Sequence, residues 1–121
     1  MNQAPNQKYN LRERTEKFGR NIINFAKTIP ENSITKSLIS QLVRAGTSVG
    51  ANYCEADDAS TKKDFFYKIG ICRREAKESK HWLLMIVEAA PSLKSNASLL
   101  SSEAQELNLI FSAIINRRKN K

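Results

Sequence analysis

Apolar residues recur along this chain at alternating steps of four and three, and this spacing limits the possible folds more than any other feature of the sequence. Steps of four and three return to the same face of an α-helix. No window of six residues shows clean alternation with a period of two, so the sequence predicts helices and no strands. In the first stretch, which Pro30 closes, the residues on this face are Leu11, Thr15, Phe18, Ile22, Phe25 and Ile29.

Three further stretches repeat the alternation, and residues that cap or break helices separate them. The apolar faces extend over residues 38–56, 65–90 and 100–114. Ser33 is the expected N-cap of the second helix. Thr61, with an acidic residue three positions later, resembles a capping box for the third, and Pro91 ends that helix. We expect a Ser/Asn-rich loop over residues 92–98 before the fourth.

Such sustained alternation is typical of helices that pack nearly parallel, at a crossing angle of about 20°. We therefore predict an all-α fold, an antiparallel up-and-down four-helix bundle with short loops. A chain of 121 residues that is 40% hydrophobic is suited to one core. We expect this bundle domain at residues 9–116, after a flexible N-terminal segment (1–8) and before a basic flexible tail (117–121).

The sequence favours a soluble, cytoplasmic protein with no membrane partner. No stretch approaches the ~20 consecutive apolar residues of a membrane span, and the first ten residues lack the apolar centre of a signal peptide. The two cysteines, Cys54 and Cys72, belong to no metal-binding pattern. We expect both to be small buried thiols in a reducing compartment.

The chain has few residues suited to catalysis or metal binding. Its only histidine, His81, forms a single Glu78-x-x-His81 motif, whereas di-iron bundles carry this motif on two helices. No Gly-x-Ser-x-Gly motif is present for a nucleophilic serine. We therefore expect a protein that is not an enzyme, with no catalytic residue, no metal site and no cofactor.

Two glycines, Gly46 and Gly50, lie one turn apart in the second predicted helix. Glycine inside a helix costs about 1 kcal/mol relative to alanine, so another interaction must offset the loss. A neighbouring helix that packs closely over both glycines is one explanation. The other is a backbone surface that receives a ligand or a second subunit.

Polar residues flank the apolar faces of the second and third helices. Asn52 falls on the apolar face itself, where a polar residue can fix register or oligomeric state by pairing with a partner. We expect an interhelical polar network here in preference to a metal centre. The residues of this expected network are Arg44, Asn52, Glu55, Lys68, Glu75 and Glu78.

The net charge is +8, from 20 basic and 12 acidic residues. The basic residues gather in the first helix, on the polar side of the third and at the C-terminus. They either keep the protein soluble or bind a phosphate backbone with steep salt dependence. Most aromatic residues fall at core positions, so base stacking is not expected. Our candidate phosphate-binding residues, of which Arg74 is the most open to a salt bridge instead, are Arg12, Arg14, Lys17, Arg20, Arg73, Arg74, Lys77, Lys80, Arg117 and Arg118.

The sequence over residues 9–90 resembles a known family. Its most distinctive part is residues 41–53, QLVRAGTSVGANY, and the first helix, residues 11–30, is also similar. The family is that of the bacterial four-helix-bundle proteins, also called 23S rRNA intervening-sequence proteins. The last helix matches only in type. Further matching residues are Glu55, Ala56, Asp64, Phe65, Lys68, Arg74, Glu75, Glu78, Trp82 and Leu83.

The resemblance implies a four-helix bundle that assembles into a ring-like homo-oligomer, typically a pentamer, without catalytic activity. Members are encoded within insertions in ribosomal RNA genes or stand alone in genomes. A similar, basic bundle is the accessory protein of the reverse transcriptase in diversity-generating retroelements, where it associates with nucleic acid. This chain departs from the family at Ala45, commonly serine, and at His81, commonly tyrosine. A histidine would let an interface titrate near neutral pH.

Two functions follow as hypotheses. The first is a non-enzymatic, homo-oligomeric bundle that binds RNA or DNA through its basic surface. The alternative is an oligomeric scaffold for a protein partner such as a reverse transcriptase, with nucleic acid contacted only indirectly. In that case Gly46, Gly50 and Asn52 would mediate subunit packing.

Overall fold

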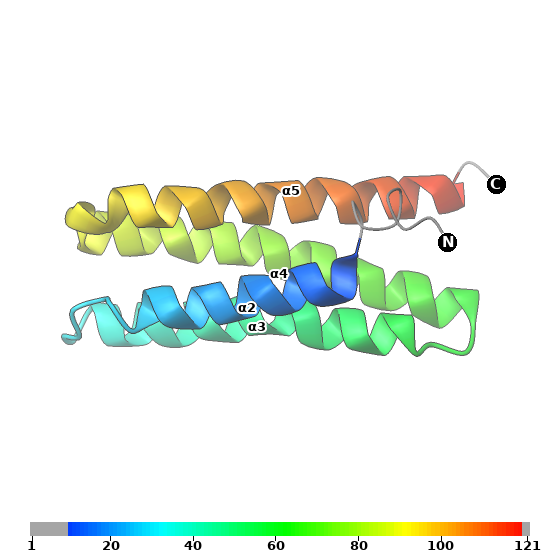
Figure 1. The fold of residues 1–121 in the computed structure, drawn as a ribbon, viewed down its shortest axis with the longest axis horizontal. Coiled ribbons are helices and arrows are strands. Elements are labelled where there is room, and N and C mark those ends of the chain that lie inside the picture. Colours follow the sequence, from blue (N-terminus) through cyan, green and yellow to red (C-terminus); the bar gives the residue numbers. More distant parts are fainter. Residues whose placement is uncertain (1–9, 120–121) are drawn as a thin grey trace.

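The computed structural model describes residues 10–119, which form four long α-helices joined by short connections (Figure 1). The helices are α2 (Leu11–Ala26), α3 (Thr35–Asp57), α4 (Lys62–Ala89) and α5 (Lys94–Lys119). Neighbours in sequence run antiparallel, and the described part of the chain contains no strand. The predicted antiparallel up-and-down bundle is therefore confirmed.

Side chains accept hydrogen bonds from free N–H groups at three helix starts, and one of these caps differs from the prediction. Asn10 Oδ1 accepts from the N–H of Glu13 at 3.3 Å at the start of α2. Thr61 Oγ1 accepts a hydrogen bond of 3.0 Å from the backbone N–H of Asp64, as expected for the start of α4. Ser33 does not cap α3. Instead Asn32 Oδ1 accepts from the N–H of Thr35 at 2.9 Å, because the turn after Pro30 brings the asparagine to the free N–H groups.

The connection between α4 and α5 is shorter than the predicted loop. Pro91 opens a turn of 3₁₀ helix, η1 (Pro91–Leu93), and α5 begins directly after it at Lys94. Proline is tolerated at the first position of a helical turn because its missing N–H needs no partner there. At the other end α5 continues through Arg117 and Arg118, where the sequence predicts a flexible tail. Residues 1–8 lie outside the described residues.

All four helices contribute buried apolar side chains to a single core. The residues of the predicted apolar faces supply most of it, including the fully buried side chains of Ile22, Val49 and Phe111. Asn52 is half-buried at the edge of this core. None of the helices in residues 10–119 is long and apolar enough to cross a membrane.

The two cysteines occupy different environments. Cys72 is buried in α4, and this burial raises the pKa of its thiol to about 12. Cys54 is exposed, so our expectation of two buried thiols is wrong for this residue. It lies off the apolar face of α3, between Asn52 and Ala56, and faces solvent.

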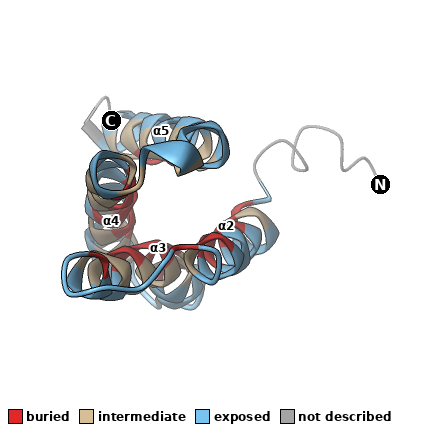
Figure 2. Cartoon of the chain, turned by 90° about the vertical axis from the view of Figure 1, so that its left-hand side faces the viewer, coloured by how far each residue is buried: buried red, intermediate tan, exposed pale blue. Residues whose placement is uncertain are grey.

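The bundle is packed unevenly. α3 packs against α2 and α4, and α4 packs against α5, but α2 and α5 approach each other less closely. Seen from one end, the ribbon forms an open C with α2 and α5 at its two tips (Figure 2). Arg14 of α2 bridges this side, because its Nε and Nη2 donate to Glu103 of α5 at 2.7 and 2.9 Å, and Nη2 also donates to Glu106 at 3.0 Å.

We expect Arg14→Met to lower the free energy of unfolding by about 1–2 kcal/mol, because it removes charge-assisted bonds across the least closely packed side. The hydrogen bond to Glu103 raises the pKa of Arg14, so the guanidinium stays charged at all ordinary pH values. Arg20→Met is the matched control, since among residues 10–119 Arg20 pairs only with the exposed Glu16 of its own helix, at 3.1 Å. Urea unfolding followed by circular dichroism measures the free energy of unfolding of both variants. Equal losses of this free energy would contradict a stabilising role for the Arg14 bridge.

Candidate nucleic-acid interface

α2 packs over the two glycines of α3. A Cβ added at Gly46 would lie 2.8 Å from Cγ1 of Ile22, and one at Gly50 would lie 3.3 Å from the carbonyl oxygen of Thr15. The side chain of Asn52 donates to the carbonyl of Ser48 in its own helix, at 2.9 Å. The geometry favours the first explanation of the glycines, the close approach of a neighbouring helix.

Charged residues of the expected polar network join α3 to α4. Arg44 contacts Glu75 at 3.2 Å and Glu78 at 2.7 Å, and Lys68 forms an ion pair with Glu55. The hydrogen bond to Glu78 raises the pKa of Arg44, so this cation stays charged. The α3–α4 side therefore carries paired charges. Asn52 stands apart from these pairs, because its amide bonds within α3.

Most of the candidate phosphate-binding residues of α2 already contact carboxylates. Lys17 is the exception, since it is exposed and forms no ion pair within residues 10–119. A cation that is held by a carboxylate has less charge to offer a phosphate group. The pairs, with their N–O distances, are Arg12–Asp57 at 2.9 Å, Arg12–Asp58 at 4.0 Å, Arg14–Glu103 at 2.7 Å, Arg14–Glu106 at 3.0 Å and Arg20–Glu16 at 3.1 Å.

The candidate residues of α4 are placed differently. Arg73 and Lys77 form no ion pair with any carboxylate of the described chain, and Arg74 has only a long contact of 3.9 Å to Glu75. Lys80 donates to the neutral side chain of Gln105 at 3.0 Å. These four cations line one hollow between α4 and α5, with a volume of about 660 Å³.

Two more hollows lie between α4 and α5, and one of them shares Lys77 and Lys80 with the first. One has a volume of about 440 Å³ and lies toward the start of α5. The other has a volume of about 530 Å³ and lies where α4 begins and α5 ends. We call the three hollows together the α4–α5 groove. Its cationic residues are Lys62, Lys63, Arg73, Arg74, Lys77, Lys80, Lys94, Arg117 and Arg118.

The antiparallel packing of α4 and α5 brings these cations together. Arg117 and Arg118, at the end of α5, line the same hollow as Lys62 and Lys63 at the start of α4. Lys62, Lys63 and Lys94 were missed as candidates from the sequence. Lys62 and Lys63 are visible in the sequence as two adjacent basic residues directly after the capping residue of α4. Which residues of α5 lie near them depends on the register of the two helices, and the sequence does not show this register.

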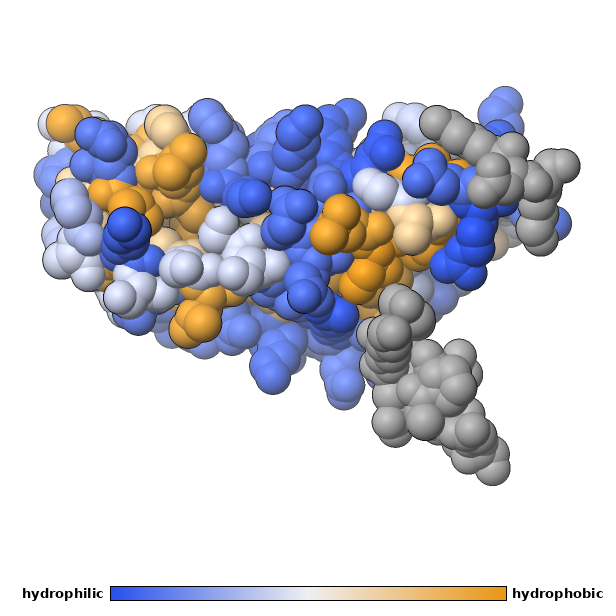
Figure 3. Space-filling view, turned by 90° about the horizontal axis from the view of Figure 1, so that it is seen from above, coloured by the Kyte–Doolittle hydropathy of each residue, from blue (hydrophilic) through white to orange (hydrophobic). Residues whose placement is uncertain are grey.

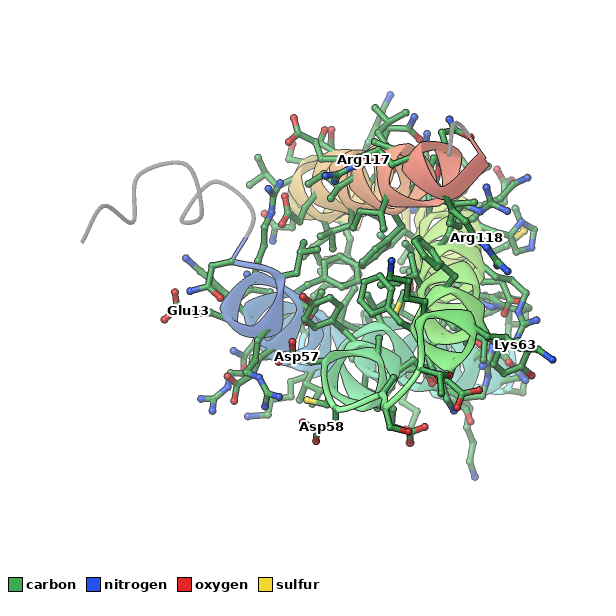
Figure 4. The ribbon with its side chains drawn as sticks, turned by 90° about the vertical axis from the view of Figure 1, so that its right-hand side faces the viewer. Glu13, Asp57, Asp58, Lys63, Arg117 and Arg118 are labelled. Atoms are coloured by element: carbon green, nitrogen blue, oxygen red, sulfur yellow. The ribbon has the colours of Figure 1, made fainter. Side chains whose placement is uncertain are left out.

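Acidic residues are segregated from the groove. Within the described chain, no aspartate or glutamate lines any of the three hollows. Figure 4 shows Lys63 and Arg118 on the outer side of α4 and α5, and Glu13, Asp57 and Asp58 on the opposite side, near α2 and α3. Seen from above, hydrophilic residues cover the middle of the α5 face, and apolar residues appear toward both ends (Figure 3). The three hollows are thus lined by cations, and among the described residues the 3.9 Å contact between Arg74 and Glu75 is the one ion pair that these cations form.

Other chemistry has less support within residues 10–119. No group of His, Cys, Asp and Glu side chains in this range is placed to hold a metal ion. His81, at the edge of the 440 Å³ hollow, packs edge-on against the ring of Trp82, with centroids 4.9 Å apart. Among the described residues, the arrangement that suits a ligand best is therefore the cationic groove.

Comparisons with known proteins identify a matching family and similar solved structures. The sequence model described as "23S rRNA-intervening sequence protein" matches residues 7–113. No curated protein matches the chain significantly. A solved protein of unknown function from Bacteroides thetaiotaomicron VPI-5482, assigned to the S23 ribosomal protein family, is similar at 27% sequence identity and a TM-score of 0.76. The match covers 86% of this chain and 96% of that one.

Proposed function

The chain belongs to the 23S rRNA-intervening sequence protein family, and we propose that it is a non-enzymatic, homo-oligomeric bundle that binds RNA or DNA through the α4–α5 groove. One observation carries the proposal: the cations of this groove have no lining carboxylates among the described residues, whereas most cations of α2 are paired. Unpaired cations attract phosphates most strongly, because no neighbouring charge cancels them.

The dimensions of the groove are suited to a polyanion. α4 has 28 residues, so at 1.5 Å per residue it is about 42 Å long, enough to follow several successive phosphates. Polar side chains such as Asn108 and Gln105 lie between the cations. Contacts of this kind hold a backbone and carry no sequence information. We therefore propose binding that depends on charge and shape and not on base sequence.

Binding is tested by titrating the protein against labelled RNA and DNA of equal length, in single- and double-stranded form, at 50 and 200 mM salt. We expect non-specific binding near the micromolar range, with the affinity for a duplex falling with salt at a log–log slope of about −4 if four or five phosphates are contacted. Binding to neither polymer at 50 mM salt would refute the proposal. Affinity that does not change with salt would also refute it.

Exposed apolar residues favour a second candidate function, assembly with a protein partner. Leu84 and Leu99 are 63% and 76% exposed, and Leu84 lies in the same hollow as Val87. Apolar side chains at such exposure are suited to an interface. This candidate predicts that the chain alone does not retain nucleic acid, so the same titration separates the two.

A further inference from the structure

One end of the α4–α5 groove combines an aromatic ring with cations. Phe65, Phe66 and Ile114 line the hollow of about 530 Å³, and Lys62, Lys63, Arg117 and Arg118 surround them. We propose that this end is a binding site for an unpaired nucleotide, whose base stacks on Phe66 while the adjoining phosphates contact these cations. The inference rests on the proposed function and adds the class of nucleic acid, a single strand or a single-stranded end.

Phe66 is available for such a contact, unlike the aromatic residues that pack in or against the core. Phe65 packs against the hydrophobic core, whereas Phe66 is half-buried and does not belong to it. The two rings meet edge to face, with centroids 5.2 Å apart and planes at 80°. This contact holds the Phe66 ring in place. Phe66 also lies off the apolar face of α4, which is why its role was not expected from the sequence.

The side chain of Arg118 packs over the face of the Phe66 ring. Its guanidinium carbon lies 5.2 Å from the ring centroid, in a cation–π contact. The side chain is exposed, so a base that enters the hollow can take its place over the ring. The guanidinium then contacts the phosphate of the same nucleotide, and no charge is left without a partner.

The composition of the hollow selects an unpaired base over a duplex. Its apolar floor offers nothing to a bare phosphate, whereas the face of any base gains from contact with an aromatic ring. A base inside a duplex is already stacked on both sides and cannot present a face. Single-stranded bases that stack on aromatic side chains, with phosphates on neighbouring cations, are the common mode of single-strand recognition.

The test uses an oligonucleotide that carries 2-aminopurine, whose fluorescence falls when the base stacks. We expect quenching when the intact protein binds the single strand, and about tenfold weaker single-strand binding for Phe66→Leu. Duplex affinity and its salt dependence should not change in this variant. Phe66→Tyr keeps the ring and should restore binding. Tyr67→Leu is the matched control, since Tyr67 is 66% exposed and does not line the hollow.

Each outcome decides the inference. Quenching together with a loss confined to the single strand in Phe66→Leu supports it. Unchanged fluorescence, or equal single-strand binding by Phe66→Leu and the unsubstituted protein, overturns it and leaves the proposed function intact if duplex binding persists. Failure of the unsubstituted protein to bind either polymer overturns both. Circular dichroism verifies that Phe66→Leu is folded, as expected for a side chain outside the core.

Discussion

Replacing Gly46 with leucine should lower the free energy of unfolding by about 3 kcal/mol or more, because α2 has no room for a side chain at this position. Even a Cβ would lie 2.8, 2.9 and 3.0 Å from Cγ1, Cγ2 and Cβ of Ile22. These atoms are close to the backbone of α2, and the Ile22 side chain is completely buried. A β-branched side chain has few alternative rotamers, so α2 itself must move away.

Two alanine substitutions turn this expectation into a sharper comparison. Gly46→Ala should destabilise the protein by about 1–2 kcal/mol, because the clash with Ile22 outweighs the gain in helix propensity. Gly70→Ala should stabilise it by up to about 1 kcal/mol, because a Cβ at Gly70 meets no heavy atom within 4 Å. Urea unfolding measures both. Shifts of the same sign would show that the close approach of α2 to α3 is not what requires glycine at position 46.

The same comparison separates the two explanations of the glycine pair. If Gly46 served a second subunit, leucine would change the oligomeric mass and leave the unfolding of the protomer nearly unchanged. If α2 covers Gly46, as the contact with Ile22 indicates, leucine lowers the free energy of unfolding of the protomer itself. We expect the second result.

The fold could be predicted from the sequence because helical periodicity is a local property. The alternating steps of four and three place Phe18, Ile22 and Val49 on faces that the structure buries. The match of the family model over residues 7–113 confirms the resemblance seen in residues 41–53. Helix ends were predicted less well, because a cap depends on which side chain the turn brings to the free N–H groups. Asn32 takes the role expected of Ser33 for this reason.

The candidate interface could be predicted only in part, because sequence shows where cations are and not what faces them. Arg12 meets Asp57, which lies 45 residues away, whereas Lys77 meets no carboxylate of the described chain. Such differences arise from the packing of helices that are distant in sequence. Similarly, Phe66 joins Arg118 only because α4 and α5 run antiparallel in one particular register.

Removing the central cations of the groove should weaken nucleic-acid binding more than any other change of equal charge. We expect the triple variant Arg73→Gln, Lys77→Gln, Lys80→Gln to bind a duplex on the order of 10²–10³-fold more weakly at 0.1 M salt. The log–log salt slope should become shallower by about 3, since each phosphate contact contributes about 0.9. All three side chains are exposed, so the free energy of unfolding should change little.

The control removes the same formal charge from α2, in Arg12→Gln, Lys17→Gln, Arg20→Gln. Both variants lower the net charge of +8 by the same amount, so a general attraction between a basic protein and a polyanion would weaken equally in both. A groove mechanism predicts a much smaller loss in the control, because Arg12 and Arg20 are already held by Asp57 and Glu16. Binding curves at several salt concentrations compare the two slopes. Equal losses would mean that net charge alone drives binding and that the α4–α5 groove has no special part in it.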